Sequence, residues 1–212
     1  MNPAAFLPFA EASDVINPMT YWVVENALAQ LGRWNESHPG LTMAINLSMR
    51  NLLDRSCPDT LAAIVREVGV DPGVVEFELT ETAIMADPET AMTALARITA
   101  SGSRLAIDDF GTGYSSLSYL KRLPVDVLKI DRSFIADMTS GARSLAIVQS
   151  TVQLAHSLDL GVVAEGIEDR EGVRALREMK CDIAQGFFFS RPEPAETAAR
   201  HLANGGWIDV PT

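Results

Sequence analysis

Basic side chains are scarce in this 212-residue chain. Its 17 Lys and Arg residues stand against 28 Asp and Glu residues, so the net charge is −11. An acidic surface repels a phosphate backbone, so duplex DNA or RNA is not expected as a partner. A small phosphate ligand remains compatible with this charge, because bound divalent cations reverse the local sign of the field.

Cysteines and long apolar runs are scarce as well. The two cysteines, Cys57 and Cys181, fit no metal-binding or disulfide spacing, which favours reduced thiols in a cytoplasmic protein. No apolar run approaches the ~20 residues that a bilayer-spanning helix needs. The first twelve residues contain no Lys or Arg, which is unlike a signal peptide. With 47% hydrophobic residues, the sequence predicts one domain over residues 1–212 with a sizeable core.

Short apolar segments alternate with helical ones along the chain. Segments rich in Val, Ile, Leu and Phe predict six buried parallel strands, over Met43–Ser48, Val74–Glu81, Arg104–Phe110, Val127–Arg132, Val162–Glu168 and Ile183–Ser190. Between them we expect helices over Asn17–Trp34, from Asp87 to before Gly102, over Ser144–Leu160 and from Asp169 to Lys180. We expect Asn17 and Asp87 to cap the first two helices and Gly161 to end the third. Trp22 and Trp34 are predicted to lie in the core. Repeated strand–helix units predict an α/β fold with a parallel sheet.

Polar side chains distinguish between a barrel and an open, doubly wound sheet. An open sheet should concentrate them at one switch point, whereas a barrel brings all strand ends to one mouth. Here they are spread over the C-terminal ends of all six strands, which favours the barrel. The residues are Asn46, Glu78, Glu81, Asp108, Asp109, Lys129, Asp131, Glu165, Glu168 and Gln185.

The adjacent acids Asp108 and Asp109 are the sharpest feature of this set. Carboxylates that converge on one mouth repel each other, and divalent cations with oxygen ligands, Mg or Mn, relieve that repulsion. One acid of a pair can bridge two ions while the other binds the second ion. Two ions ~3.5–4 Å apart suit in-line displacement at phosphorus. A single Asp or Glu is more often a helix cap or a solvated loop residue, but that does not explain six polar strand ends.

Lys129 lies in the middle of a predicted strand, where a buried ammonium needs an anionic partner. It is either half of a structural ion pair, with Asp131 or a neighbouring acid, or a cation that holds a phosphate or the attacking water. The two interpretations are compatible. The segment Gly111-Thr112-Gly113-Tyr114 follows the two acids, and a Gly-x-Gly of this kind is usually only a turn. Beside candidate metal ligands it is better interpreted as a mobile loop that shapes the site.

These residues together resemble the EAL family of cyclic-di-GMP phosphodiesterases. The motifs follow in the family's order and spacing, and they cover nearly the whole chain. They are Asn46-Leu47-Ser48, Glu78-Leu79-Thr80-Glu81, Asp108-Asp109-Phe110-Gly111-Thr112-Gly113-Tyr114-Ser115-Ser116, Leu128-Lys129-Ile130-Asp131, Ala164-Glu165-Gly166-Ile167-Glu168 and Gln185-Gly186-Phe187.

The resemblance implies a TIM-like (β/α) barrel that hydrolyses cyclic di-GMP to linear pGpG with two Mg or Mn ions. It implies that Asn46, Glu78 and Asp108 bind one ion, and that Asp108, Asp109 and Glu165 surround the other. Glu165 is then the general base, and Lys129 positions water and phosphate. Glu81 would hold the glycine-rich loop, while Asp131, Glu168 and Gln185 complete the pocket. A homodimer or an upstream regulatory domain is a possible partner.

The sequence departs from the family at its front. In the family, a strand carrying Glu-Ala-Leu precedes a segment that resembles Pro3–Glu11 of this chain. We therefore expect about six of the eight barrel strands, with the first two and a metal-binding Glu absent. The chain alone is then expected to be weakly active or inactive. Three hypotheses follow: a phosphodiesterase, a degenerate module that binds cyclic di-GMP or a partner protein without turnover, and an unrelated metal-dependent barrel, which the motif series disfavours.

Overall fold

A computed structural model of the protein describes residues 3–113, 117–139 and 141–204, with side chains from residue 5 onward. The chain forms two compact units. Of the described residues, 3–107 and 117–125 belong to the first unit, and 108–113, 126–139 and 141–204 belong to the second. The division falls inside strand β3 (Arg104–Phe110), between Ile107 and Asp108. Among the described residues, no helix has the length and apolar character needed to cross a membrane.

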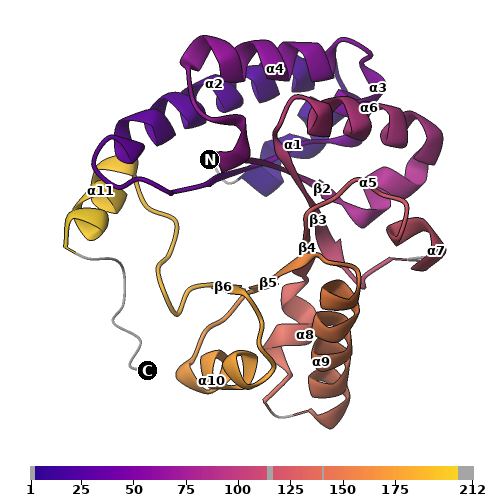
Figure 1. The fold of residues 1–212 in the computed structure, drawn as a ribbon, viewed down its shortest axis with the longest axis vertical. Coiled ribbons are helices and arrows are strands. Elements are labelled where there is room, and N and C mark those ends of the chain that lie inside the picture. The colour runs from indigo at the N-terminus through magenta and orange to yellow at the C-terminus, as the bar shows by residue number, and fades with distance from the viewer. Residues whose placement is uncertain (1–2, 114–116, 140, 205–212) are drawn as a thin grey trace. The chain divides into compact units, whose positions relative to one another are not determined.

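The first unit contains strands β1 and β2 and the first four residues of β3, together with helices (Figure 1). β1 and β2 are parallel, with Asn46 opposite Glu78. The elements are α1 (Pro3–Glu11), α2 (Ile16–Asn35), β1 (Met43–Asn46), α3 (Met49–Leu53), α4 (Cys57–Val68), the 3-10 helix η1 (Pro72–Val74), β2 (Val75–Thr80), α5 (Glu81–Ala86), α6 (Pro88–Ala100) and α7 (Leu117–Leu120).

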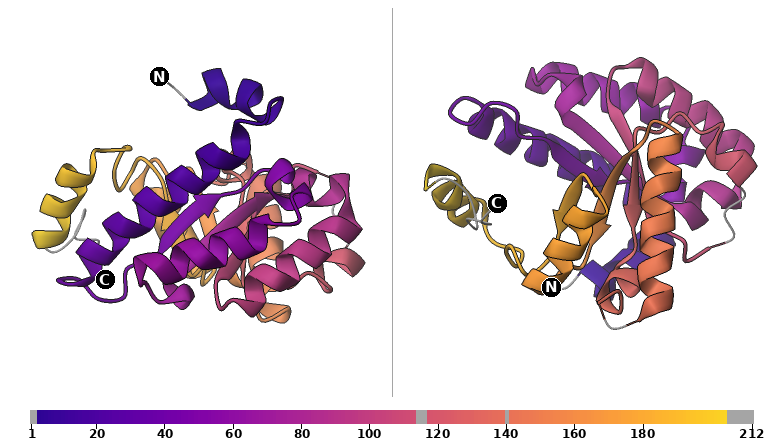
Figure 2. Two further views of the ribbon diagram at one scale, coloured as in Figure 1. Left: turned by 90° about the horizontal axis from the view of Figure 1, so that it is seen from above. Right: turned by 60° about the horizontal axis from the view of Figure 1, so that its bottom comes forward.

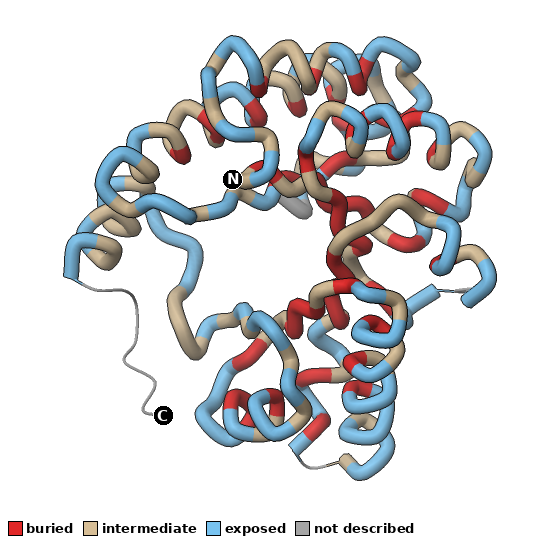
Figure 3. Tube along the Cα trace, viewed as in Figure 1, coloured by how far each residue is buried: buried red, intermediate tan, exposed pale blue. Residues whose placement is uncertain are grey.

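The second unit contains the end of β3 and the parallel strands β4, β5 and β6. Helix α9 packs along β4 and β5 (Figure 2). β4 is buried along its whole length, as expected for the interior of a parallel sheet (Figure 3). The elements are β4 (Val127–Ile130), α8 (Arg132–Ala136), α9 (Ala142–Ser157), β5 (Gly161–Glu165), α10 (Arg170–Glu178), β6 (Ile183–Gln185) and α11 (Ala195–Ala203).

All six predicted strands are confirmed, but five of them end sooner than the sequence predicts. Each of these five strands ends at, or within two residues after, one of its predicted polar residues. Glu81 is the first residue of α5, and Asp131 is the N-cap of α8. The residues predicted to end these strands therefore lie in the turns that follow them.

Helix α2 shows why two other predictions were wrong. Its buried face includes Val24, Leu28 and Leu31, spaced as one face of an α-helix. Trp22 lies off this face and is 64% exposed, so it is not a core residue. Asn17 is not the cap either, because the helix begins at Ile16 and Asn17 lies inside it. The side chain of Asn17 instead donates a hydrogen bond to Asp54 (3.0 Å).

Helices α9 and α10 both end in a Schellman motif, in which amide groups beyond the helix bond back to carbonyls of its last turn. After α9, the amides of Asp159 and Leu160 bond to His156 and Ala155. Asp159 takes the left-handed conformation (φ 58°), so it ends the helix in place of the predicted Gly161. After α10, Lys180 takes the same role with φ 62°. The predicted cap of α6 is confirmed, because Asp87 accepts from the Thr90 amide. Helix α10 follows Asp169 as expected, and the Asp169 carboxylate accepts from the Gly172 amide.

Candidate active site

Polar side chains recur at alternate positions toward the C-terminal ends of the strands in the second unit. Lys129 on β4 lies opposite Val163, two residues before Glu165 on β5. Glu165 in turn lies opposite Gln185, the last residue of β6. Because side chains alternate between the two faces of a strand, Lys129 and Glu165 point to the same face of the sheet.

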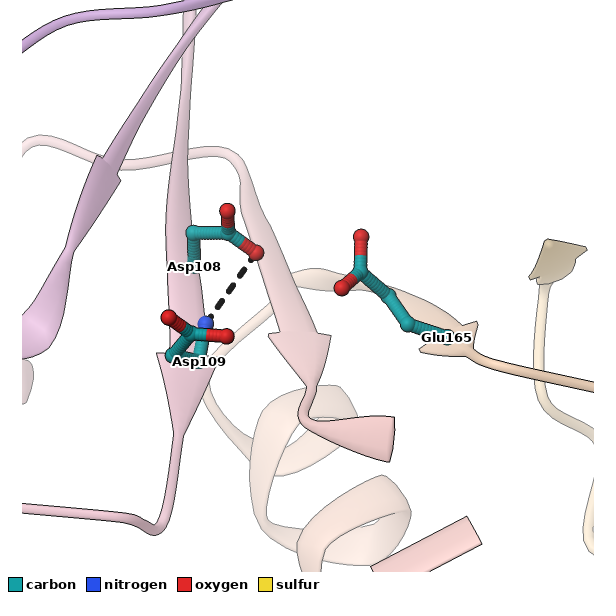
Figure 4. A group of neighbouring side chains, drawn as sticks. All are labelled: Asp108, Asp109 and Glu165. Carbon is teal, nitrogen blue, oxygen red and sulfur yellow. Dashed lines mark hydrogen bonds between the residues drawn. The ribbon is translucent and has the colours of Figure 1, made fainter. Parts of the chain in front are cut away.

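Three carboxylates converge at this end of the second unit. Asp108, Asp109 and Glu165 each offer an oxygen within 4.8 Å of the others. In Figure 4, the carboxylates of Asp108 and Glu165 point toward each other from β3 and β5, and the carboxylate of Asp109 lies beside them. Among the described residues, this is the one cluster of acids, histidines and cysteines with metal-ligand spacing. The predicted acid pair and Glu165 are thus confirmed as neighbours.

Lys129 lies between two of these acids. Its Nζ atom is 2.6 Å from Glu165 Oε1 and 3.2 Å from Asp108 Oδ1, and its side chain is only 4% exposed. A buried ammonium needs such partners, since an unpaired charge is costly to desolvate. Of the two interpretations of Lys129, the ion pair is therefore observed. Its acids are also candidate metal ligands, so the functional role remains compatible with it.

The backbone at Asp109 is unusual. Asp109 has a left-handed conformation (φ 53°), which is uncommon outside glycine but tolerated by Asp. Its amide donates to the Asp108 carboxylate (3.1 Å), drawn as the dashed line in Figure 4. The Thr112 hydroxyl donates back to the Asp109 carbonyl (2.9 Å), which closes a tight turn. The turn lets two consecutive residues bring their carboxylates into one cluster.

Asp109 and Asp131 form a hydrogen-bonded pair of acids with opposite pKa shifts. Burial and the charges of Asp108, Asp131 and Glu165 raise the pKa of Asp109 above its usual value. The pKa of Asp131 is lowered despite burial, because it accepts from the amide and hydroxyl of Ser133 and from Asp109. Asp109 is thus the acid of this pair that holds a proton more readily.

In the first unit, Asn46 and Glu78 are directly opposite each other on β1 and β2. Asn46 is exposed, whereas Glu78 is only 5% exposed. Glu81, also 5% exposed, begins α5 after Thr80, whose hydroxyl caps that helix by accepting from the Ala83 amide. Asn46 and Glu78 are therefore neighbours within this unit, and their assignment to one metal ion stays a prediction.

A buried polar network fixes the turn that follows Asn46. Asn51 is fully buried, and its Oδ1 atom accepts from the Ser48 amide (2.7 Å) in a capping box at the start of α3. Its Nδ2 atom donates to Asn17 Oδ1 (2.8 Å) on α2. The network ties α2 to the Asn46-Leu47-Ser48 segment.

The other predicted site residues lie at the surface. Glu168 and Gln185 are both exposed, in the loop after β5 and at the end of β6. Gly111, Thr112 and Gly113 are exposed in the turn after β3, and Tyr114 lies outside the described residues. The assignment of these residues to a pocket stays a prediction.

The sequence reasoning missed Ser133, whose amide and hydroxyl both bind the Asp131 carboxylate. A signal was available in the sequence. Asp131-Arg132-Ser133 follows a strand at the start of a helix, and Asp at that position commonly binds amides of the first turn. Asp131 is therefore a helix cap as well as a candidate pocket residue.

The acid cluster fits a hard divalent cation. All its donors are carboxylate oxygens, which are the ligands that Mg and Mn prefer. The Lys129 ammonium pairs with two of the three carboxylates. Burial, and after it repulsion from neighbouring acids, raises the pKa of Asp109, and a bound cation would relieve that repulsion. The cluster could hold a metal ion, and nothing in the geometry selects one metal.

A family model described as the EAL domain matches residues 1–192. The chain belongs to the EAL domain family. An uncharacterized protein of Azorhizobium caulinodans is 46% identical over 207 residues, which cover 93% of this chain and 28% of that protein. The cyclic di-GMP phosphodiesterase NbdA of Pseudomonas aeruginosa is 40% identical over 195 residues, which cover 92% of this chain and 25% of NbdA. This EAL chain thus spans between a quarter and a third of the length of these two relatives.

Solved EAL structures confirm the predicted fold class. A complex of the PaMucR phosphodiesterase with c-di-GMP is 37% identical, has a TM-score of 0.89, and aligns over 93% of this chain and 80% of its own. The similarity of fold places the six strands of this EAL domain in a TIM-barrel-like architecture.

Proposed function

We propose that this EAL domain hydrolyses cyclic di-GMP to linear pGpG with the help of Mg or Mn. The observation that carries the proposal is the cluster of Asp108, Asp109 and Glu165 around the buried ammonium of Lys129. The relative NbdA, named a cyclic di-GMP phosphodiesterase, and the c-di-GMP complex of PaMucR support the choice of substrate.

The carboxylates of Asp108, Asp109 and Glu165 would hold metal ions, with Asn46 and Glu78 as the further proposed ligands. Bound there, divalent ions would lower the pKa of a coordinated water and offset negative charge on the phosphate. The fixed turn at Asp109 would keep two ligands in place without reorganisation, since its backbone is already held by Asp108 and Thr112.

Glu165 would accept a proton from the attacking water. The water oxygen would then bond to phosphorus on the face opposite the 3′ oxygen of the ribose. The bond from phosphorus to that oxygen breaks, and the oxygen takes up a proton, which leaves linear pGpG with a 5′ phosphate. Lys129 would orient the Glu165 carboxylate and attract the phosphate, because its ammonium contacts Glu165 directly.

The test is pGpG release from cyclic di-GMP by the chain with Mn²⁺, followed by anion-exchange chromatography. We expect slow formation of linear product, in keeping with the weak activity expected of this chain, that stops when a chelator is added in excess and resumes with fresh Mn²⁺. Binding of cyclic di-GMP without product would favour the non-catalytic module instead. Product formation that continues in excess chelator would contradict the metal-dependent mechanism.

A further inference from the structure

We propose that Phe134, on helix α8, is a positioning residue that holds the turn after Asp109 and thereby aims the Asp109 carboxylate into the acid cluster. The inference rests on the proposed function, in which that cluster binds metal. Phe134 has no group that could bind a metal or transfer a proton, so its effect would act through the backbone of the turn.

The ring of Phe134 lies directly against the backbone of Gly111. A Cβ atom at Gly111 would lie 2.9 Å from the ring carbon Cε2, closer than real Cβ atoms approach, and 3.3 Å from Cζ, which is a tight contact. Gly111 also has φ 97°, a conformation that other residues rarely adopt. The turn therefore cannot move toward α8, and the ring fills the space into which it would otherwise relax.

The same helix supports the residue after Glu165. Gly166 has φ 78°, and a Cβ atom there would lie 2.5 Å from the Cβ atom of Arg132, the first residue of α8. One short helix thus packs against the backbone two residues after Asp109 and one residue after Glu165. This arrangement fixes the spacing between two of the three acids of the cluster.

Helix α8 is itself well anchored. Asp131 caps it through Ser133, and Ile135 and Met138 on and just after the helix are buried, at 4% and 2% exposure. Phe134 is only partly buried, so filling the core is not its main contribution. A ring on an anchored helix, pressed against a glycine in a functional turn, suits a positioning role.

The experiment compares Phe134→Ala with Phe134→Leu in the whole chain. Mn²⁺ affinity is measured by the electron paramagnetic resonance signal of free Mn²⁺, and hydrogen exchange is measured for the peptide that contains residues 109–113, without metal. We expect Phe134→Ala to weaken Mn²⁺ binding by ~10–100-fold, the usual effect of losing a group that orients a ligand. Exchange in that peptide should rise, and Phe134→Leu should be intermediate in both measurements.

Phe189→Ala is the matched control. Phe189 is a partly buried phenylalanine of the same unit, and its ring packs edge-on against Phe188, with centroids 5.3 Å apart. We expect this variant to keep the Mn²⁺ affinity and the exchange rate of the unsubstituted chain, even if it melts at a lower temperature.

A double variant separates direct contact from general loss of stability. Gly111→Ala alone should weaken Mn²⁺ binding, because its Cβ meets the ring. With Phe134→Ala already present, the same change should cost measurably less, since the obstructing ring is gone. Independent effects of the two changes, or unchanged exchange at residues 109–113 in Phe134→Ala, would overturn the inference. If the unsubstituted chain binds no Mn²⁺, the proposed metal chemistry fails, and the exchange measurement alone decides the role of Phe134.

Discussion

Lys129 Nζ lies 2.6 Å from Glu165 Oε1, and the lysine side chain is buried, with only 4% of its surface exposed. The lysine also contacts Asp108, so one cation is shared by two candidate metal ligands. Its removal should therefore disturb chemistry more than substrate binding.

Lys129→Ala is expected to lower kcat by ~10²–10⁴-fold, the range for a positioned group in proton transfer. The affinity for cyclic di-GMP should change much less, because the proposed role of Lys129 lies in the chemical step. Steady-state kinetics together with equilibrium binding separate the two effects. Lys121→Ala, which removes an exposed lysine, is the control and should behave as the unsubstituted chain does. An increase in KM with kcat unchanged would refute the assigned role.

Asp108→Asn and Glu165→Gln should each abolish measurable pGpG formation while keeping the shape of the side chain. Each change removes one negative charge from the three-carboxylate cluster, and Glu165→Gln also removes the proposed base. Asp159→Asn is the matched control, because Asp159 lies in a left-handed turn that Asn tolerates equally well. Turnover at the unsubstituted rate by Asp108→Asn would contradict the metal assignment.

Asn51→Ala should destabilise the chain by about 1–3 kcal/mol, because the backbone amide of Ser48 and the side-chain Oδ1 atom of Asn17 would lose their buried partner. Urea unfolding monitored by circular dichroism measures this. Asn26→Ala removes a comparable side chain from the exposed face of α2, and its effect should stay within about 0.5 kcal/mol. Equal effects of the two substitutions would show that the network adds no stability.

Gly186→Ala should destabilise the chain through steric overlap. A Cβ atom there would lie 2.2 Å from the oxygen and 2.3 Å from the nitrogen of Ile167. That backbone cannot yield easily, because it bonds to Gln185 (3.0 Å) and Phe188 (2.9 Å). We expect a loss of about 1–3 kcal/mol or more. Thermal melts of the variant measure this loss. Gly161→Ala is the control: a Cβ atom there would lie 3.7 Å from its nearest neighbours, so this substitution should be neutral or slightly stabilising.

Cys181 should react slowly with alkylating reagents. Burial, aided by the charge of Asp182, raises the pKa of its thiol from the usual 9.0 to about 11. At pH 8 this leaves roughly 100-fold less thiolate, the reactive form, because each pKa unit is a tenfold change. Cys57→Ala removes the other thiol, and in that variant the alkylation rate of Cys181 should rise with pH up to about 11. The folded state keeps its proton longer than the unfolded state, so the thiol's contribution to stability is lost as pH rises from 9 to 11. A midpoint of alkylation near 9 would contradict the burial of this thiol.

The sequence predicted the strands and the acid cluster well, because both depend on local patterns. Apolar runs marked the strands, and Asp108, Asp109 and Glu165 stood at strand ends that parallel topology brings together. The burial of Trp22 was predicted wrongly, because it depends on which face of α2 packs against other elements. The apolar character of Trp22 does not show that it lies outside that face. The packing of Phe134 on Gly111 could not be predicted from local sequence patterns, because the two residues belong to a helix and a turn that are separated along the chain. The cytoplasmic location, a homodimer and a regulatory domain stay predictions.

The two helix ends at Asp159 and Lys180 leave room for protein engineering. Both residues adopt a left-handed backbone that costs an ordinary L-residue roughly 1–2 kcal/mol and costs glycine little. In this conformation Lys180 ends α10, a role that glycine fills at lower cost. Helix α10 separates Lys180 along the chain from the acid cluster. A substitution at position 180 can therefore relieve backbone strain, and we expect it to leave the acid cluster unchanged. Directed evolution toward higher melting temperature should find glycine or asparagine at position 180 early.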